Sequence, residues 1–351
     1  MNKIGKSTDS LMRHIRNEHK IDIHGSKQKI ALINMGYFHS YKAYRFNKNP
    51  KQLLPIKNFS EIQTVYTLDS NLKELFYPEL MKIETALKNR VISFVSSNCE
   101  ASIYSIIDNK LTYAKDIKDE LKEAKRELKE LRKCNAPNPD ISKARKKVDI
   151  IRKRYLNQNS SLLKLKSSVD NLISEDYRKK GITQHYLHSN QPIPIWACFE
   201  LFSLGNLAYF IMNLNVDTKK GLCKNLEFQL REYDPKILTD SIFLLKDLRN
   251  AIAHNKIIFD CRFQNNISKT VKHYYHDSIN NLDFSFKSIT DYVIVVYYFL
   301  TILKFSKTEC KRFVKKYKNI INKLKQDSSF QDVFNSIFCH DDFNKLNTLI
   351  S

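Results

Sequence analysis

The chain has 351 residues, and 42% of them are hydrophobic, which excludes an intrinsically disordered protein and allows a sizeable core. Six glycines are too few for a fold rich in hairpins and favour helices. The formal net charge of +22 favours a polyanionic partner, with nucleic acid ahead of an anionic membrane surface. The alternative is a compositional bias toward Lys and Asn of the kind that AT-rich genomes produce.

The seven cysteines are scattered and contain no CxxC pair, which predicts reduced thiols rather than a disulfide framework or a zinc site. The first twenty residues are polar and charged, so we expect no signal peptide. The most apolar late stretch, Tyr292 to Phe305, is too short to span a bilayer and predicts a buried helix. We therefore expect a cytoplasmic protein.

The first 105 residues form two predicted regions, and the composition of the chain changes after them. Residues 1–26 are charged and weakly patterned, which predicts a loose basic arm or an irregular lead-in. Residues 27–105 form an N-terminal helical region that opens with aromatic residues around Lys42 and Arg45, in the segment INMGYFHSYKAYRF. Rings interleaved with cations can stack nucleobases and bind RNA, with Lys42 and Arg45 on its phosphates. The alternative is a helix whose aromatic face is part of the core.

Apolar residues at helical spacing then predict helices over Glu61 to Phe76 and over Leu80 to Val95. We expect Pro78 to end the first helix or to lie in the first turn of the second, because proline has no backbone N–H. In the second helix, Glu84 and Lys88 are four residues apart and predict an ion pair on the helix surface.

Residues 106–175 predict an inserted antiparallel helical hairpin of the coiled-coil type. A narrow apolar seam in a charged background marks the first arm: Ile117, Leu121, Ala124, Leu128 and Leu131. The sequence CNAPNPD predicts the turn between the arms. The second arm carries seven basic residues, namely Lys143, Arg145, Lys146, Lys147, Arg152, Lys153 and Arg154. They predict either RNA binding through phosphates or a solvated charged face.

Residues 176–351 form a predicted C-terminal helical region. The apolar segment NQPIPIWACFELFSLGNLAYFIMN includes Glu200, which we expect either to pair with an Arg or His or to face water. Gly205 in the same segment indicates close helix packing or a break. Four further helical stretches are predicted, over residues 236–259, 281–306, 308–325 and 330–350.

The stretch LLKDLRNAIAHNKIIF, Leu244 to Phe259, places reactive polar groups in a segment that otherwise resembles core. On a helix, Asn250 and His254 share a face, and the long side chain of Arg249 reaches the same pocket. This set suits RNA cleavage, with Arg249 on the phosphate and His254 moving a proton. Asn250 and Asn255 would orient these groups while the 2′-OH attacks. The structural alternative is a buried histidine satisfied by Asn.

No cofactor and no metal is expected for this chemistry, because the nucleophile is internal to RNA and no acidic cluster suited to Mg²⁺ is evident. The bare pattern Arg-x4–6-His is a weak signal, and it recurs from Arg13 to His19 and from Arg178 to His185. Neither of these copies lies in an apolar helical frame, so the chain has one convincing copy.

The octapeptide LRNAIAHN resembles the signature of the HEPN superfamily of all-helical ribonucleases. Three further segments resemble the abortive-infection proteins of the AbiD/AbiF type, namely WACFELFSLGNLAYF, PELMKIETALKNRVISFVS and GYFHSYKAYRF. The similarity covers roughly residues 27–100 and 190–305, and the hairpin between them resembles a lineage-specific insertion. Leu204 stands where this family usually has Phe, which is a conservative departure.

The resemblance implies an all-α HEPN-type helical bundle and a metal-independent endoribonuclease of a bacterial anti-phage system. Arg249, Asn250 and His254 are the catalytic residues that it implies, with Asn255 and Glu200 supporting them. Because HEPN sites combine two motifs, it further implies a homodimer, with RNA as substrate and a small structured non-coding RNA as a possible partner.

Other functions fit parts of the same pattern. A non-catalytic RNA-binding protein, such as a ribonucleoprotein component or an RNA-dependent antitoxin, would need only the basic surface. A HEPN-like target of nucleotide transfer is a third hypothesis. A membrane-surface protein fits least well, because the basic helices are not matched by exposed aromatic faces.

Overall fold

In the computed structural model, residues 5–97, 99–111, 113–264 and 266–350 are described. The all-α prediction is confirmed, since these residues form helices and only isolated β-bridges. The chain divides into two compact units: residues 1–83 with 247–351, and residues 84–246. Two helices, α3 (Phe59–Val95) and α11 (Lys236–Ala253), have residues in both units.

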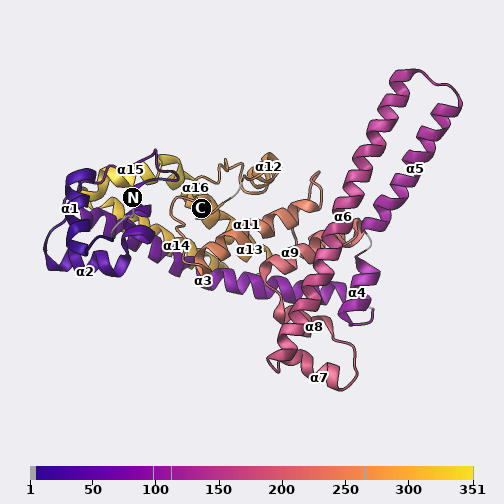
Figure 1. Cartoon of the computed structure of the whole chain (residues 1–351), viewed down its shortest axis with the longest axis horizontal. Helices are drawn as coiled ribbons and strands as arrows, with labels where there is room; N and C mark the ends of the chain where they lie inside the picture. Colours follow the sequence, from indigo (N-terminus) through magenta and orange to yellow (C-terminus); the bar gives the residue numbers. More distant parts are fainter. Residues whose placement is uncertain (1–4, 98, 112, 265, 351) are drawn as a thin grey trace. The chain divides into compact units, whose positions relative to one another are not determined.

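The first unit is built around α13 (Ile289–Ile302), whose side chains are buried on nearly every face, with α14 (Lys307–Lys325) and α16 (His340–Ile350) packed against it. Its sequence is apolar around the whole circumference, which is typical of a helix inside a core. Besides parts of α3 and α11, the unit contains α1 (Thr8–His19), α2 (Gly25–Met35), η1 (Tyr37–Tyr41), η2 (Ala43–Arg45), α12 (Lys269–Ser278), α13 (Ile289–Ile302), α14 (Lys307–Lys325), η3 (Ser328–Phe330), α15 (Gln331–Ile337) and α16 (His340–Ile350) (Figure 1).

The prediction of a loose basic arm is wrong for residues 8–19, because they form helix α1. The Ser7 side chain caps this helix by accepting from the Ser10 N–H, and Met12 and Ile15 are buried. These two apolar residues are three apart and anchor one face of a helix that is otherwise charged, which made the pattern weak in the sequence. Residues 1–4 of the predicted arm lie outside the described residues.

The predicted break at Pro78 is also wrong, because α3 continues through it. Pro78 has no N–H to donate to the Glu74 carbonyl, but both residues are exposed, so water can reach that group. Leu75 and Leu80 on either side are buried and keep the helix on the core. The predicted ion pair further along α3 is confirmed, with 3.1 Å between Lys88 Nζ and Glu84 Oε1.

The second unit contains the predicted hairpin, whose arms α5 and α6 run side by side (Figure 1). The predicted seam is confirmed: Ile117, Leu121, Ala124 and Leu128 are buried, and Leu131 packs against them. Besides parts of α3 and α11, this unit consists of α4 (Ile103–Lys110), α5 (Tyr113–Lys133), α6 (Asn138–Arg178), α7 (Ile182–His188), α8 (Ile195–Leu201), α9 (Leu204–Asn213) and α10 (Val216–Asn225).

Four predicted stretches differ from the observed helices. The stretch 236–259 is helical only to Ala253. The stretch 190–213 is two helices, because Phe202 is extended and Ser203 caps α9 in a capping box with Asn206. The stretch 281–306 is helical only from Ile289, and the stretch 330–350 contains both α15 and α16. Helices α4, α7, α10 and α12 were not predicted individually.

The cysteines and the lengths of the helices bear on two further predictions. All seven cysteines are free thiols in the structure. In the part of the chain that the structure describes, every helix is too short or too polar to cross a membrane.

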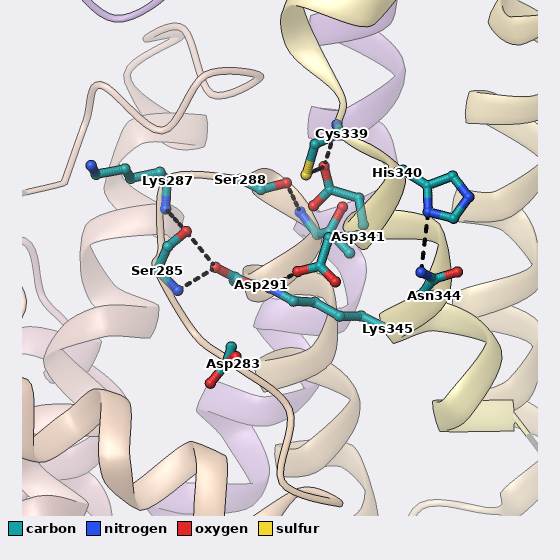
Figure 2. Close-up of polar contacts among 12 residues, drawn as sticks. Asp283, Ser285, Lys287, Ser288, Asp291, Cys339, His340, Asp341, Asn344 and Lys345 are labelled. Carbon is teal, nitrogen blue, oxygen red and sulfur yellow. Dashed lines mark hydrogen bonds and ion pairs between the residues drawn. The ribbon is translucent and has the colours of Figure 1, made fainter.

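A buried ion pair joins α16 to α13 in the first unit (Figure 2). Lys345 Nζ lies 2.9 Å from Asp291 Oδ1, and Asp291 is fully buried. The other carboxylate oxygen accepts the backbone N–H groups of Ser285 and Phe286. Burial raises the pKa of Asp291, although the adjacent Lys345 opposes this shift. The pair is stabilising only as long as both partners are present.

The substitution Lys345→Met should lower the free energy of unfolding of this unit by about 3 to 5 kcal/mol, because it leaves the Asp291 carboxylate buried without a cation. The loss should shrink as the pH falls, because protonation of the Asp291 carboxyl group removes the unpaired buried charge. Urea unfolding measures both effects. Lys323→Met, at an exposed position of α14, is the control, and equal losses in the two variants would contradict the role of the pair.

Candidate functional site

The motif predicted from the sequence lies where α11 ends. Leu248, Ala251 and Ile252 are buried and fix one face of the helix, whereas His254 and Asn255 are exposed. Arg249 and Asn250 are half-buried. An exposed histidine does not fit the alternative of a buried residue satisfied by Asn, and its imidazole is open to a ligand.

Helix α11 ends in a Schellman motif that fixes the backbone of His254. The N–H of Asn255 donates to the Ile252 carbonyl at 3.0 Å, and the N–H of Lys256 donates to the Ala251 carbonyl at 2.8 Å. Asn255 has a φ of 51°, a left-handed conformation that Asn adopts more readily than most residues. Asn255 therefore has a structural role at the helix end in addition to its predicted supporting one.

The structure brings Arg249 and Asn250 together through their side chains. The Nη1 group of Arg249 donates to Asn250 Oδ1 at 3.3 Å, a long hydrogen bond. Asn250 is joined to His254 through the backbone, since the N–H of His254 donates to its carbonyl at 3.0 Å. A guanidinium, an amide and an imidazole thus follow one another at the end of one helix.

A buried carboxylate on α3 holds the chain that follows the motif. Asp69 is fully buried, and its Oδ1 accepts the backbone N–H groups of Ile258 and Phe259, both at 2.8 Å. Its Oδ2 accepts the hydroxyl of Tyr44 at 2.8 Å and lies 2.8 Å from Lys73 Nζ. Four donors therefore compensate the desolvation of one charge.

Lys73 extends this network to the motif, because its Nζ also donates to Asn255 Oδ1 at 2.8 Å. One ammonium group thus joins the buried Asp69 to the residue that ends α11. Burial raises the pKa of the Tyr44 hydroxyl, and the neighbouring Asp69 raises it further, so the hydroxyl stays protonated and donates its hydrogen bond to Asp69.

Sequence reasoning missed Asp69 and Lys73. A signal was present, since Asp69 lies four residues after Val65 and three before Leu72, on the apolar stripe of α3. An acid at such a position needs a partner, and Lys73 follows at the i+4 position.

Glu200, predicted to support the site, lies exposed on α8 in the second unit. Facing water was one of its two expected environments. The other was an ion pair with an Arg or His, and Glu200 makes no such pair among the described residues. The His, Cys, Asp and Glu side chains that are described form no group of three or more suited to a metal.

The seven basic residues predicted to bind RNA on the hairpin are all exposed on α6. Two of them are neutralised by the first arm: Lys147 Nζ lies 2.7 Å from Glu127, and Arg154 pairs with Glu120. The other five have no carboxylate of the described chain within ion-pair distance, namely Lys143, Arg145, Lys146, Arg152 and Lys153. They form the cationic surface of the hairpin.

Of the two predicted RNA-binding residues near the N-terminus, Lys42 is exposed and Arg45 is half-buried. Lys42 lies over the ring of Phe38, and Arg45 lies over the ring of Tyr41. The sequence also allowed this aromatic segment to be part of the core. Tyr41 and Tyr44 fit that alternative because they are buried, whereas Phe38 is exposed.

Asp69→Ala should lower the free energy of unfolding by about 3 to 5 kcal/mol, because it leaves Lys73 and two backbone N–H groups without their buried acceptor. Glu74→Ala, an exposed acid on the same helix, should change it by less than about 0.5 kcal/mol. Urea unfolding of the two variants tests this. A similar midpoint for both would show that Asp69 does not hold the chain after the motif.

Comparison with known proteins gives a family but no near relative. Residues 31–260, more than half of the chain, match the family model described as Abi-like protein. The matched region includes the aromatic segment, the hairpin and the whole of the Arg249 to His254 motif. Comparisons with curated proteins and with solved structures gave no match. The chain therefore belongs to the Abi-like family of abortive-infection proteins.

Proposed function

We propose that the protein is a metal-independent endoribonuclease of the HEPN type that acts in anti-phage abortive infection. The observation that carries this proposal is the end of α11, where the exposed His254 imidazole follows an Arg249 guanidinium bonded to Asn250. Membership of the Abi-like family supports the defence role. The resemblance of LRNAIAHN to the HEPN signature supports the reaction.

The side chains suit a phosphodiester cleavage in which the RNA supplies its own nucleophile and a second group takes the proton-transfer role that His254 does not. The substrate 2′-oxygen attacks the adjacent phosphorus as it loses its proton, and the bond from phosphorus to the 5′-oxygen breaks. His254 takes the 2′ proton or supplies one to the leaving 5′-oxygen. Arg249 binds the phosphate and stabilises the negative charge that develops on it. The products are a 2′,3′-cyclic phosphate and a 5′-hydroxyl.

In an in-line displacement, the attacking 2′-oxygen and the leaving 5′-oxygen lie on opposite sides of the phosphorus, so one imidazole does not serve both oxygens in a concerted step. A homodimer would supply a second Arg249 and a second His254 to one composite site. This arrangement follows from the HEPN resemblance and from the single convincing motif in the chain.

The active site is exposed and small, so affinity for RNA has to come from other surfaces. The five unneutralised cations on α6 can bind phosphates and release counterions, which makes the affinity depend on salt. The same surface suits a small structured RNA that restrains or guides the enzyme. Such a complex would act in the cytoplasm, where cellular and phage transcripts lie.

A non-catalytic RNA-binding protein is the second candidate function, and the cationic surface of the hairpin favours it. It needs the basic residues of α6 and makes no use of His254. The two functions are therefore separable by a single substitution at the motif.

His254→Ala should reduce RNA cleavage by at least about 100-fold, because general acid and base catalysis typically contributes that much or more. RNA affinity should stay within about twofold, since the exposed imidazole is not a phosphate anchor. Cleavage assays and filter binding with the same labelled RNA measure the two quantities. His273→Ala on α12, another exposed histidine, is the control. Unchanged cleavage by His254→Ala would favour the non-catalytic alternative.

A further inference from the structure

A row of aromatic rings in η1 runs from the core to the surface of the first unit. Tyr41 is fully buried and stacks on Tyr37, with ring centroids 5.3 Å apart. Tyr37 meets Phe38 edge to face at 5.2 Å, and Phe38 is 70% exposed. The inner rings belong to the core. The outer ring is held by its neighbours but has an open side, at a π-helical turn, a conformation frequent at functional sites.

A cation lies at the exposed end of this row. Lys42 Nζ is 4.8 Å from the centroid of the Phe38 ring and 5.3 Å from that of the Tyr37 ring. Lys42 is itself exposed, so its ammonium group can contact a ligand that covers the ring. An aromatic ring with an adjacent cation matches a nucleotide, which presents a flat base beside a phosphate.

The surroundings of the row are positive. His19 Nδ1 is 2.7 Å from the Tyr41 hydroxyl, and burial lowers the pKa of His19 to about 4. The charges of Arg45, His14 and Lys42 act in the same direction, and only Glu18 opposes them. His19 is thus neutral mainly because it is buried, whereas Arg45 and Lys42 provide positive charge beside the row that attracts an anion.

The row is joined to the chain beyond the motif by buried contacts. Tyr44, three residues after Tyr41, donates to Asp69, and Asp69 accepts the backbone N–H groups of Ile258 and Phe259. The rings of Tyr44 and Phe259 also stack, with centroids 6.0 Å apart. A ligand on the outer ring would therefore be held by the same unit that carries His254.

We propose that Tyr37, Phe38 and Lys42, here called the stacking platform, bind an unpaired base and the adjoining phosphate of single-stranded RNA. The inference rests on the proposed function for the identity of the ligand and adds that the bound segment is single-stranded, since a paired base offers no free face to the Phe38 ring. A protein partner fits less well, because lysine is depleted from the centres of protein interfaces.

The test uses a single-stranded RNA of about ten nucleotides that contains one 2-aminopurine, whose fluorescence is quenched when the base stacks. Binding is measured in the His254→Ala background, so that the RNA stays intact. Phe38→Ala should weaken binding by about 5- to 100-fold and reduce the quenching, as expected for the loss of one stacked base. Phe38→Trp should restore both. Lys42→Ala should weaken binding and lower the number of counterions released on binding by about one, as read from the salt dependence of the affinity.

Tyr77→Ala, an exposed aromatic residue on α3, is the matched control and should bind RNA as the parent does. Unchanged affinity in Phe38→Ala, or equal losses in Phe38→Ala and Phe38→Trp, would overturn the platform. A duplex RNA that competes as well as the single strand would also overturn it. None of these results depends on cleavage, so the platform and the nuclease activity can fail independently.

Discussion

The arrangement of the first unit depends on one buried charge, that of Asp69. A carboxylate without solvent contact costs several kcal/mol unless donors replace its water, and here two backbone N–H groups, a tyrosine hydroxyl and an ammonium group do so. The donors come from η2, from α3 and from the chain after α11. One side chain thus fixes three separate parts of the chain relative to one another.

In the motif, Asn255 therefore has a structural role, whereas His254 is left exposed. Asn255, held by Lys73 and by its left-handed backbone, ends α11, and the chain after it is held by Asp69. His254 precedes this anchored point and remains exposed. A rigid support behind an accessible imidazole is what proton transfer to a bound substrate requires, because the supporting residues keep its backbone in place.

Much of the fold could be predicted from the sequence, because most of its helices have a regular apolar stripe. The hairpin seam from Ile117 to Leu131 and the pair of Glu84 with Lys88 follow from local spacing alone. Pro78 was misjudged because a proline breaks a helix only where its missing hydrogen bond cannot be replaced. Helix α1 was missed because two buried residues, Met12 and Ile15, decide its packing, and they stand among charged neighbours.

The candidate residues of the motif could be proposed from the sequence, but the network that holds the chain after them could not. The segment LRNAIAHN singles out Arg249, Asn250 and His254 by their residue types and by their spacing on a helix. The network of Tyr44, Asp69 and Lys73 joins residues up to 190 positions apart, and no spacing rule connects them. The same limit applies to Phe38, since the sequence of its segment is equally compatible with buried and exposed rings.

The chemistry of the RNA ends tests the central claim most directly. Purified protein is incubated with a defined single-stranded RNA in the presence of a chelator, and the termini of the products are identified. The account predicts 2′,3′-cyclic phosphates with 5′-hydroxyls, the products of 2′-OH attack without a metal. Products with 3′-hydroxyls and 5′-phosphates, or an RNA that is bound and left intact, would contradict it.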